Sequence, residues 1–186
     1  MANTSVALSS IEAKRKLAAA LVRKKLSEPK HFPLSAAQQR LWFLDQLTPQ
    51  SSAYNVPYQM RLKGQLSVDA MSKSLNEIVR RHAVLRTRFV SQNGEPMQEV
   101  LPELTVPLEM LDLSHEQNSS REDLVRRCVR EECVRGFDLE KGPLLRVKLI
   151  RMKEEEHVLV VSMHHIVSDG WSLGVLVKEF GVLYEA

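Results

Sequence analysis

The chain has 186 residues, 44% of them hydrophobic and 26% charged, which is ordinary for a globular domain that buries its own core. No apolar stretch approaches the ~20 residues that span a bilayer, and the N-terminus lacks the apolar segment of a secretory signal. We therefore expect a cytoplasmic protein that is not a membrane partner. The net charge of +3 is uneven, because residues 1–30 carry seven basic and two acidic residues. This segment has no aromatic residue to stack on bases, which argues against nucleic-acid binding.

The first predicted element is a basic helix. Ser9 and Glu12 have the spacing of a capping box, and apolar residues continue at helical spacing to about Leu26. The basic face has three interpretations: a solvated face of a packed helix, a docking element for an acidic partner, or a membrane-surface helix. The last is disfavoured because no Trp or Phe would anchor it. Residues 1–30 are therefore taken as a separate segment, with a short linker over residues 29–33.

Along the rest of the chain, segments whose apolar residues recur about every 3.6 residues, as in helices, alternate with segments in which they recur every two residues, as in strands. This alternation predicts an α/β fold. Helices are expected from Ser35 to Leu47, from Ser67 to His82, from Ser120 to Val134 and from Ser172 onward. Strands are expected over residues 54–62, 84–91, 96–101, 106–111, 144–152 and 158–163. Asn93-Gly94 predicts a hairpin turn, and the polar residues 153–156 predict an antiparallel return. No stop signal follows the last helix, so the chain is expected to be part of something larger.

The most informative pattern is the run of residues 163–172, MHHIVSDGWS, in which two histidines end an apolar stretch and an Asp-Gly pair follows. Imidazole titrates nearest neutrality, so it can accept and return a proton during turnover. A glycine-containing turn at the end of a strand leaves room for a substrate beside such a ring. We predict an active site in which one histidine faces a cavity as general base and the other faces the interior. The nucleophile then comes from a second substrate.

Three other interpretations of the histidine pair remain open. Adjacent strand residues point to opposite faces, so His164 and His165 are poorly placed to share a metal ion, and no HExxH-type spacing supplies further ligands. A serine hydrolase would use Ser168 or Ser172, but no GxSxG elbow is present. The third interpretation is a histidine pair satisfied within a core. Asp169 is expected either to orient the cavity-facing ring or to pair with an arginine.

Four segments, in order along the chain, resemble the motifs of one known family. They are residues 35–44 (SAAQQRLWFL), 81–89 (RHAVLRTRF), 137–146 (FDLEKGPLLR) and 164–172 (HHIVSDGWS). The chain is similar to the condensation domains of non-ribosomal peptide synthetases, in the chloramphenicol-acetyltransferase-like superfamily. The resemblance covers only the N-terminal lobe, residues 31–186. It implies a mixed, largely antiparallel sheet flanked by helices and preceded by an N-terminal helix. Ala83 stands where the family has a glutamate, which puts an ion pair there in doubt.

The resemblance also implies roles for the motif residues. His165, the second histidine, is the catalytic candidate. It accepts a proton from, or positions, the α-amino group of an acceptor aminoacyl thioester while that amine attacks the donor thioester carbonyl. His164 and Asp169 are structural, Asp169 by pairing with an arginine, and Gly170 lines the acceptor path. Substrate-channel or scaffold roles, with ion pairs for the arginines, are expected for Trp171, Ser172, Arg40, Arg81 and Arg86.

The partners follow from the same resemblance. The domain itself binds no cofactor or metal, because both substrates arrive on phosphopantetheine arms of peptidyl or aminoacyl carrier proteins. The missing C-terminal lobe completes the enzyme, so the chain alone is expected to be inactive. Residues 10–26 are a candidate docking site for an upstream synthetase subunit. Two alternatives stay open: a non-catalytic docking or interaction module, and a free-standing coenzyme A-dependent acyltransferase, which would need a trimer to complete its site.

Overall fold

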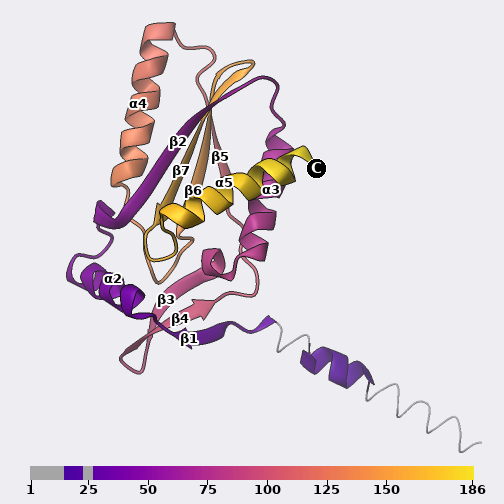
Figure 1. Ribbon diagram of the computed structural model, residues 1–186, viewed down its shortest axis with the longest axis vertical. Helices are drawn as coiled ribbons and strands as arrows, with labels where there is room; N and C mark the ends of the chain where they lie inside the picture. The colour runs from indigo at the N-terminus through magenta and orange to yellow at the C-terminus, as the bar shows by residue number, and fades with distance from the viewer. Residues whose placement is uncertain (1–14, 23–26) are drawn as a thin grey trace, which may run out of the picture.

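The structure, a computed structural model, describes residues 15–22 and 27–186 (Figure 1). Residues 15–22 are helical. The later helices are α2 (Ala36–Leu47), α3 (Val68–Arg81), α4 (Asn118–Val134) and α5 (Gly170–Glu185), with two 3-10 turns, η1 (Ser52–Tyr54) and η2 (Ala83–Arg86). The strands are β1 (Lys30–Pro33), β2 (Asn55–Lys63), β3 (Thr87–Gln92), β4 (Glu95–Val100), β5 (Leu108–Asp112), β6 (Leu145–Lys153) and β7 (Glu156–His164).

The larger sheet has the strand order β2-β7-β6-β5. Its only parallel pair among the described strands is β5–β6, and the β2–β7 and β6–β7 pairs are antiparallel. This arrangement confirms the expected mixed, largely antiparallel sheet. In Figure 1, α4 lies along one side of this sheet, while α3 and α5 lie on the other side. Among the described helices, none is both long and apolar enough to cross a membrane.

The two central strands are buried on both faces, and alternate residues belong to different cores. Leu145, Val147 and Leu149 of β6 pack with α3 and α5, together with residues 159, 161 and 163 of β7. Ile150 of β6 packs toward α4 with Val158 and Val160 of β7. Each fully buried side chain of this size contributes roughly 1.5–3 kcal/mol relative to exposure. A one-residue change of register would exchange the two faces, so this burial fixes the face on which the last residue of β7 lies.

The smaller sheet, in the order β1-β4-β3, lies at one end of the larger sheet (Figure 1). The Asn93-Gly94 pair forms the predicted hairpin turn, with positive φ at both residues. Residues 30–33, expected to be a linker, instead form β1, because they pair with β4 from Lys30↔Val100 to Pro33↔Met97. A third core, between this sheet and the residues after β7, comprises Leu34, Phe89, Phe137, Leu139, Leu144, Ile166 and Val167.

Several predicted boundaries shift in the structure. The strand expected over residues 84–91 begins only at Thr87, because residues 83–86 form the turn η2. Helix α4 begins at Asn118 rather than at Ser120. Helix α5 begins at Gly170 rather than near Ser172, because Asp169 caps it. Residues 1–14 and 23–26 lie outside the described residues, so the docking role expected for residues 10–26 stays a prediction.

Candidate active site

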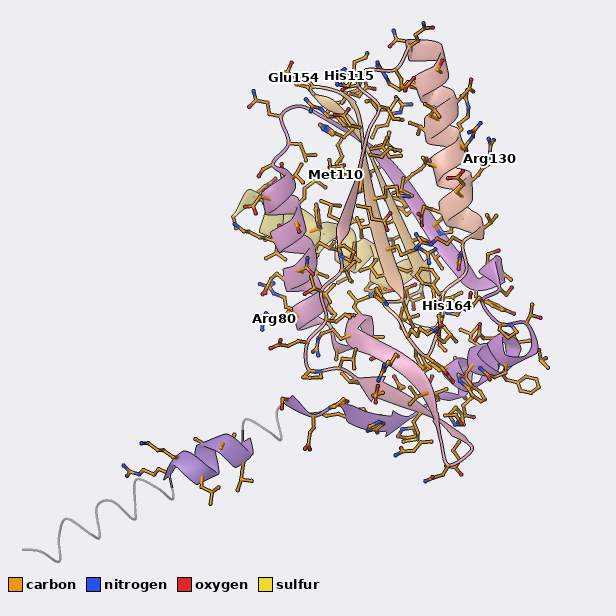
Figure 2. All side chains as sticks on the ribbon, turned by 180° about the vertical axis from the view of Figure 1, so that it is seen from behind. Arg80, Met110, His115, Arg130, Glu154 and His164 are labelled. Atoms are coloured by element: carbon orange, nitrogen blue, oxygen red, sulfur yellow. The ribbon has the colours of Figure 1, made fainter. Side chains whose placement is uncertain are left out.

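The predicted site is a tight turn between β7 and α5, and Figure 2 shows His164 at the end of the sheet that faces the small sheet. The backbone N–H of Val167 donates to the carbonyl oxygen of His164 at 3.1 Å and closes the turn. The backbone N–H of His165 donates to the carbonyl oxygen of Tyr54 at 2.8 Å. The direction in which the His165 side chain leaves the backbone is therefore tied to η1 as well as to β7.

His164 is the interior member of the pair. It is 1% exposed, and its Nδ1 accepts the backbone N–H of Ile166 at 3.1 Å. Because a backbone N–H only donates, Nδ1 carries no proton, and the neutral ring is protonated on Nε2. Burial, with a smaller contribution from the nearby His165, lowers the pKa of His164 to about 4. His164 is therefore a neutral side chain whose ring nitrogen binds the backbone of the turn, and its structural role stays a prediction.

His165 is the exposed member of the pair, and its side chain lines an open hollow of about 480 Å³. Its Nδ1 lies 2.6 Å from the carbonyl oxygen of Ser168. A carbonyl oxygen only accepts, so Nδ1 carries a proton, and in the neutral ring Nε2 then has the lone pair. Within the described residues no partner occupies Nε2. This ring can therefore accept a hydrogen bond or a proton from a group that enters the hollow.

Asp169 was expected either to orient the cavity-facing histidine ring or to pair with an arginine, and its side chain instead binds the backbone at the start of α5. Its side chain accepts the backbone N–H of Ser172 at 2.8 Å, and the Ser172 hydroxyl contacts the Asp169 backbone, which forms a capping box at the start of α5. The Ser172 backbone N–H and hydroxyl lower the pKa of Asp169. No hydrogen bond joins Asp169 to the His165 ring, and no arginine within the described residues pairs with it. Asp169 thus caps α5 and sets the residue at which the turn ends and the helix begins.

Gly170 and Trp171 face open space. A Cβ added at Gly170 would meet nothing within 4 Å, so this backbone is open to approach. The Trp171 side chain is 82% exposed, an unusual position for so large an apolar group. Both residues belong to the first turn of α5, and Ser172 also lines the hollow beside His165.

The three arginines differ in their contacts. Arg81 forms the expected ion pair, with its Nε 2.8 Å from a carboxylate oxygen of Glu77. Arg86 donates instead to backbone carbonyls of Val79, Leu101 and Pro102, so it joins the end of α3 to the segment after β4. Arg40 is exposed on α2 and has no ion pair within the described residues. The expected ion pair is therefore present at Arg81, whereas within the described residues neither Arg40 nor Arg86 forms one. The scaffold roles of the three arginines stay predictions.

Sequence reasoning missed one wall of the hollow. Gln38 of α2 donates to the backbone oxygen of Ile166 at 3.4 Å and to the Gln98 side chain at 3.3 Å. Both glutamines line the hollow with His165. The available signal was the spacing of Ser35 and Gln38, which form a capping box and so fix where Gln38 lies.

The alternative chemistries find little support in this geometry. The Ser168 hydroxyl donates to the His164 backbone oxygen at 3.2 Å, and the Ser172 hydroxyl forms hydrogen bonds with the Asp169 backbone. Neither serine therefore forms a nucleophile–base pair with an imidazole nitrogen in this structure. The described residues contain no cluster of three or more His, Cys, Asp or Glu that would hold a metal. The exposed His165 also excludes a pair of core histidines.

Comparison with known proteins identifies the family. Residues 28–186 match the condensation domain family. The chain is 43% identical over 161 residues to one of the linear gramicidin synthase proteins of Brevibacillus parabrevis. It is 41% identical over 161 residues to bacitracin synthase 2 of Bacillus licheniformis. Each match covers 87% of this chain, but only 3% and 6% of the respective relatives.

Solved structures show the same fold. The starter condensation domain of rhizomide synthetase matches with a TM-score of 0.77 at 21% identity, over 83% of this chain and 37% of that one. The first condensation domain of the CDA synthetase matches with a TM-score of 0.75 at 22% identity, over 83% and 40%. These matches confirm the expected lobe of the chloramphenicol-acetyltransferase-like fold. The chain belongs to the condensation domain family of non-ribosomal peptide synthetases and spans part of such a domain.

Proposed function

We propose that this chain contributes the catalytic imidazole, His165, to an enzyme that joins two carrier-bound acyl groups through an amide bond. The α-amino group of the acceptor attacks the thioester carbonyl of the donor. The new C–N bond forms, the C–S bond breaks, and the donor carrier leaves as a thiol. The growing chain then stays on the acceptor carrier. The substrates are aminoacyl or peptidyl thioesters on phosphopantetheine arms, as the family membership suggests.

The observation that carries the proposal is the free Nε2 of His165 in an open hollow. An α-amine has a pKa near ~8, so a weak base suffices to remove a proton during the attack. A flip of this imidazole would break the hydrogen bond between Nδ1 and the Ser168 carbonyl, so that bond favours one direction for Nε2. Orienting the amine therefore contributes alongside proton transfer.

The hollow has walls on only some of its sides. Residues from α2, β4, the turn and the start of α5 line it. Solved condensation-domain chains are more than twice as long as the segment that this chain matches. We propose that the remainder of the domain supplies the opposite wall and an arginine for Asp169, and that carrier proteins deliver their arms through the opening.

The test uses a complete condensation domain that contains this chain, with carrier-bound donor and acceptor, and measures the amide product by mass spectrometry. We expect His165→Ala to reduce product formation by about 10²-fold or more, since general bases contribute about 10²–10⁴-fold. The matched control is His115→Ala, because His115 is an exposed histidine at the opposite end of the large sheet (Figure 2). This control should retain full activity.

Product formation that is unchanged in His165→Ala would remove His165 from its role. Product that appears with free coenzyme A thioesters, and not with carriers, would favour the coenzyme A-dependent alternative. Absence of any product in the unmodified domain would favour the non-catalytic module.

A further inference from the structure

We infer that Arg146 is a positioning residue for the active-site turn: it fixes the Phe137 ring, Phe137 packs on the His164 imidazole, and His164 holds the backbone from which His165 projects. The inference deepens the proposed function and rests on it only for the role of His165. Neither Phe137 nor Arg146 lines the hollow beside His165.

The first step is the contact between Arg146 and Phe137. The guanidinium carbon of Arg146 lies 3.7 Å from the centre of the Phe137 ring, well within the range of a cation–π contact. Phe137 is 2% exposed and Arg146 retains 13% exposure of its side chain, so water weakens this contact little. A flat guanidinium covers the whole face of an aromatic ring, which the ammonium group of a lysine does not.

The second step is the contact between Phe137 and His164. Their ring centres are 6.2 Å apart and their planes meet at 84°, an edge-to-face arrangement. Tyr54 is a second aromatic neighbour of the imidazole, with a centre-to-centre distance of 6.3 Å and an angle of 55° between the planes. The His164 ring plane is therefore set by two aromatic neighbours. That plane decides whether Nδ1 meets the N–H of Ile166.

The third step is what holds Arg146 itself. Its guanidinium donates to a carboxylate oxygen of Glu132 at 3.0 Å and to the backbone oxygens of Gly136 at 3.1 Å and Arg135 at 2.6 Å. These carbonyls follow the last turn of α4, where helix carbonyls have no partner within the helix and attract a cation. Arg146 thus has almost no freedom to move away from Phe137.

Strand geometry makes this arrangement possible. Arg146 of β6 lies opposite Ser162 of β7, so Arg146 and His164 share the face of the sheet that α4 covers. Lys148 lies on the same face and also bonds Glu132, with Nζ 2.9 Å from the carboxylate, but within the described residues it has no cation–π contact with Phe137. Lys148 is therefore the matched control for loss of a cation beside Glu132.

The experiment uses nuclear magnetic resonance on the 186-residue chain with labelled histidine. Two readouts report on the turn: the ¹⁵N shifts of the His164 ring, which identify the protonated nitrogen, and the hydrogen exchange of the Ile166 amide. In Arg146→Met we expect the ¹⁵N shifts of the two His164 ring nitrogens to move toward a common average. The hydrogen exchange of the Ile166 amide should become about tenfold faster or more, beyond any acceleration that global unfolding causes. Lys148→Met should leave both readouts as in the unmodified chain.

Should Arg146→Met fail to fold, Arg146→Lys carries the test, because it keeps a cation beside Glu132 and loses the flat group over Phe137. The inference is overturned if the folded variant leaves both readouts unchanged, or if Lys148→Met changes them equally.

A kinetic measurement on the complete domain separates this inference from the proposed function. Arg146→Lys should lower kcat with little change in KM, and should have no further effect in a His165→Ala background, because it acts through that residue. If the resonance readouts change while kcat of Arg146→Lys does not, and His165→Ala is inactive, Arg146 does not position His165 for catalysis and the inference is overturned. Unchanged product in His165→Ala would instead contradict the proposed role of His165.

Discussion

At the scale of single residues, two adjacent histidines have opposite states because their surroundings differ. His164 is sealed among aromatic side chains and is held neutral, whereas His165 is exposed and has one nitrogen fixed by a carbonyl. The sequence alone predicts that the two rings face opposite sides, because side chains alternate along a strand. Which of the two faces the cavity follows from the family resemblance, and the burial in the structure agrees.

Because His164 is neutral in the folded chain, the free energy of unfolding should depend on pH. Its pKa is about 4 in the folded chain and near 6.5 when unfolded, so the unfolded state binds the extra proton between these values. The stability that this residue contributes is complete above pH 6.5 and is lost as the pH falls toward 4. The loss amounts to about 3 kcal/mol.

The measurement is urea unfolding at about pH 7 and about pH 4.5 for the unmodified chain and for His164→Asn, whose side-chain oxygen also accepts from Ile166 and does not titrate. The difference in stability between the two chains should shift by about 2–3 kcal/mol in favour of the variant at the lower pH. A difference that stays the same at both values would contradict the buried neutral state.

At the scale of elements, α5 begins where it does because Asp169 and Ser172 cap each other's backbone. The cap sets the direction in which the turn continues from His165 into the helix. The resemblance implies an arginine partner for Asp169, whereas within the described residues its carboxylate serves the helix end. These two roles place different demands on the side chain, because only the ion pair requires a charge.

Two variants of Asp169 separate the roles. Asp169→Asn keeps a side-chain acceptor for the Ser172 N–H, so we expect its urea midpoint to stay close to that of the unmodified chain. Asp169→Ala removes the acceptor and should lower the midpoint clearly, since loss of a helix cap costs about 0.5–2 kcal/mol. Equal midpoints for the two variants would show that the cap does not stabilise the chain. In the complete domain, activity lost in Asp169→Asn with stability retained would support the arginine partner.

The bounds of helices and strands can be predicted from sequence where the signals are local, and not where they depend on distant partners. Helix α3 is predictable almost to the residue, because Ser67 caps it and its apolar residues follow one stripe. Strand β1 is not, because four residues ending in proline carry no alternation and gain their partner from β4, far along the chain. The start of α5 is placed late from sequence, because Ser172 and Asp169 are both good caps and only the backbone conformation decides between them.

The same limit applies to the site. The histidine turn is predictable because its residues are consecutive. The Arg146–Phe137–His164 contacts are not, although all three residues lie in segments that resemble family motifs, because β6 and β7 must first pair in register. Gln38 illustrates the same point, since its position beside the histidine turn depends on how α2 packs on the end of the sheet.

At the scale of the whole molecule, two sheets and the ends of two helices meet around the His165 side chain. The large sheet delivers the turn, the small sheet supplies Gln98, and α2 supplies Gln38, so three separate parts of the fold share one hollow. The hollow is open on this chain, which suits a surface that a second lobe covers. We therefore expect the site to become a tunnel only in the complete domain.

The most direct test is a crystal structure of the complete condensation domain with an aminoacyl thioester analogue of the acceptor bound. We predict that the α-amino nitrogen of the analogue lies about 3 Å from Nε2 of His165, with Nδ1 still bonded to Ser168. An amine bound elsewhere, with the His165 side chain turned into the core or sealed from the pantetheine arm, would contradict the proposed role of this imidazole.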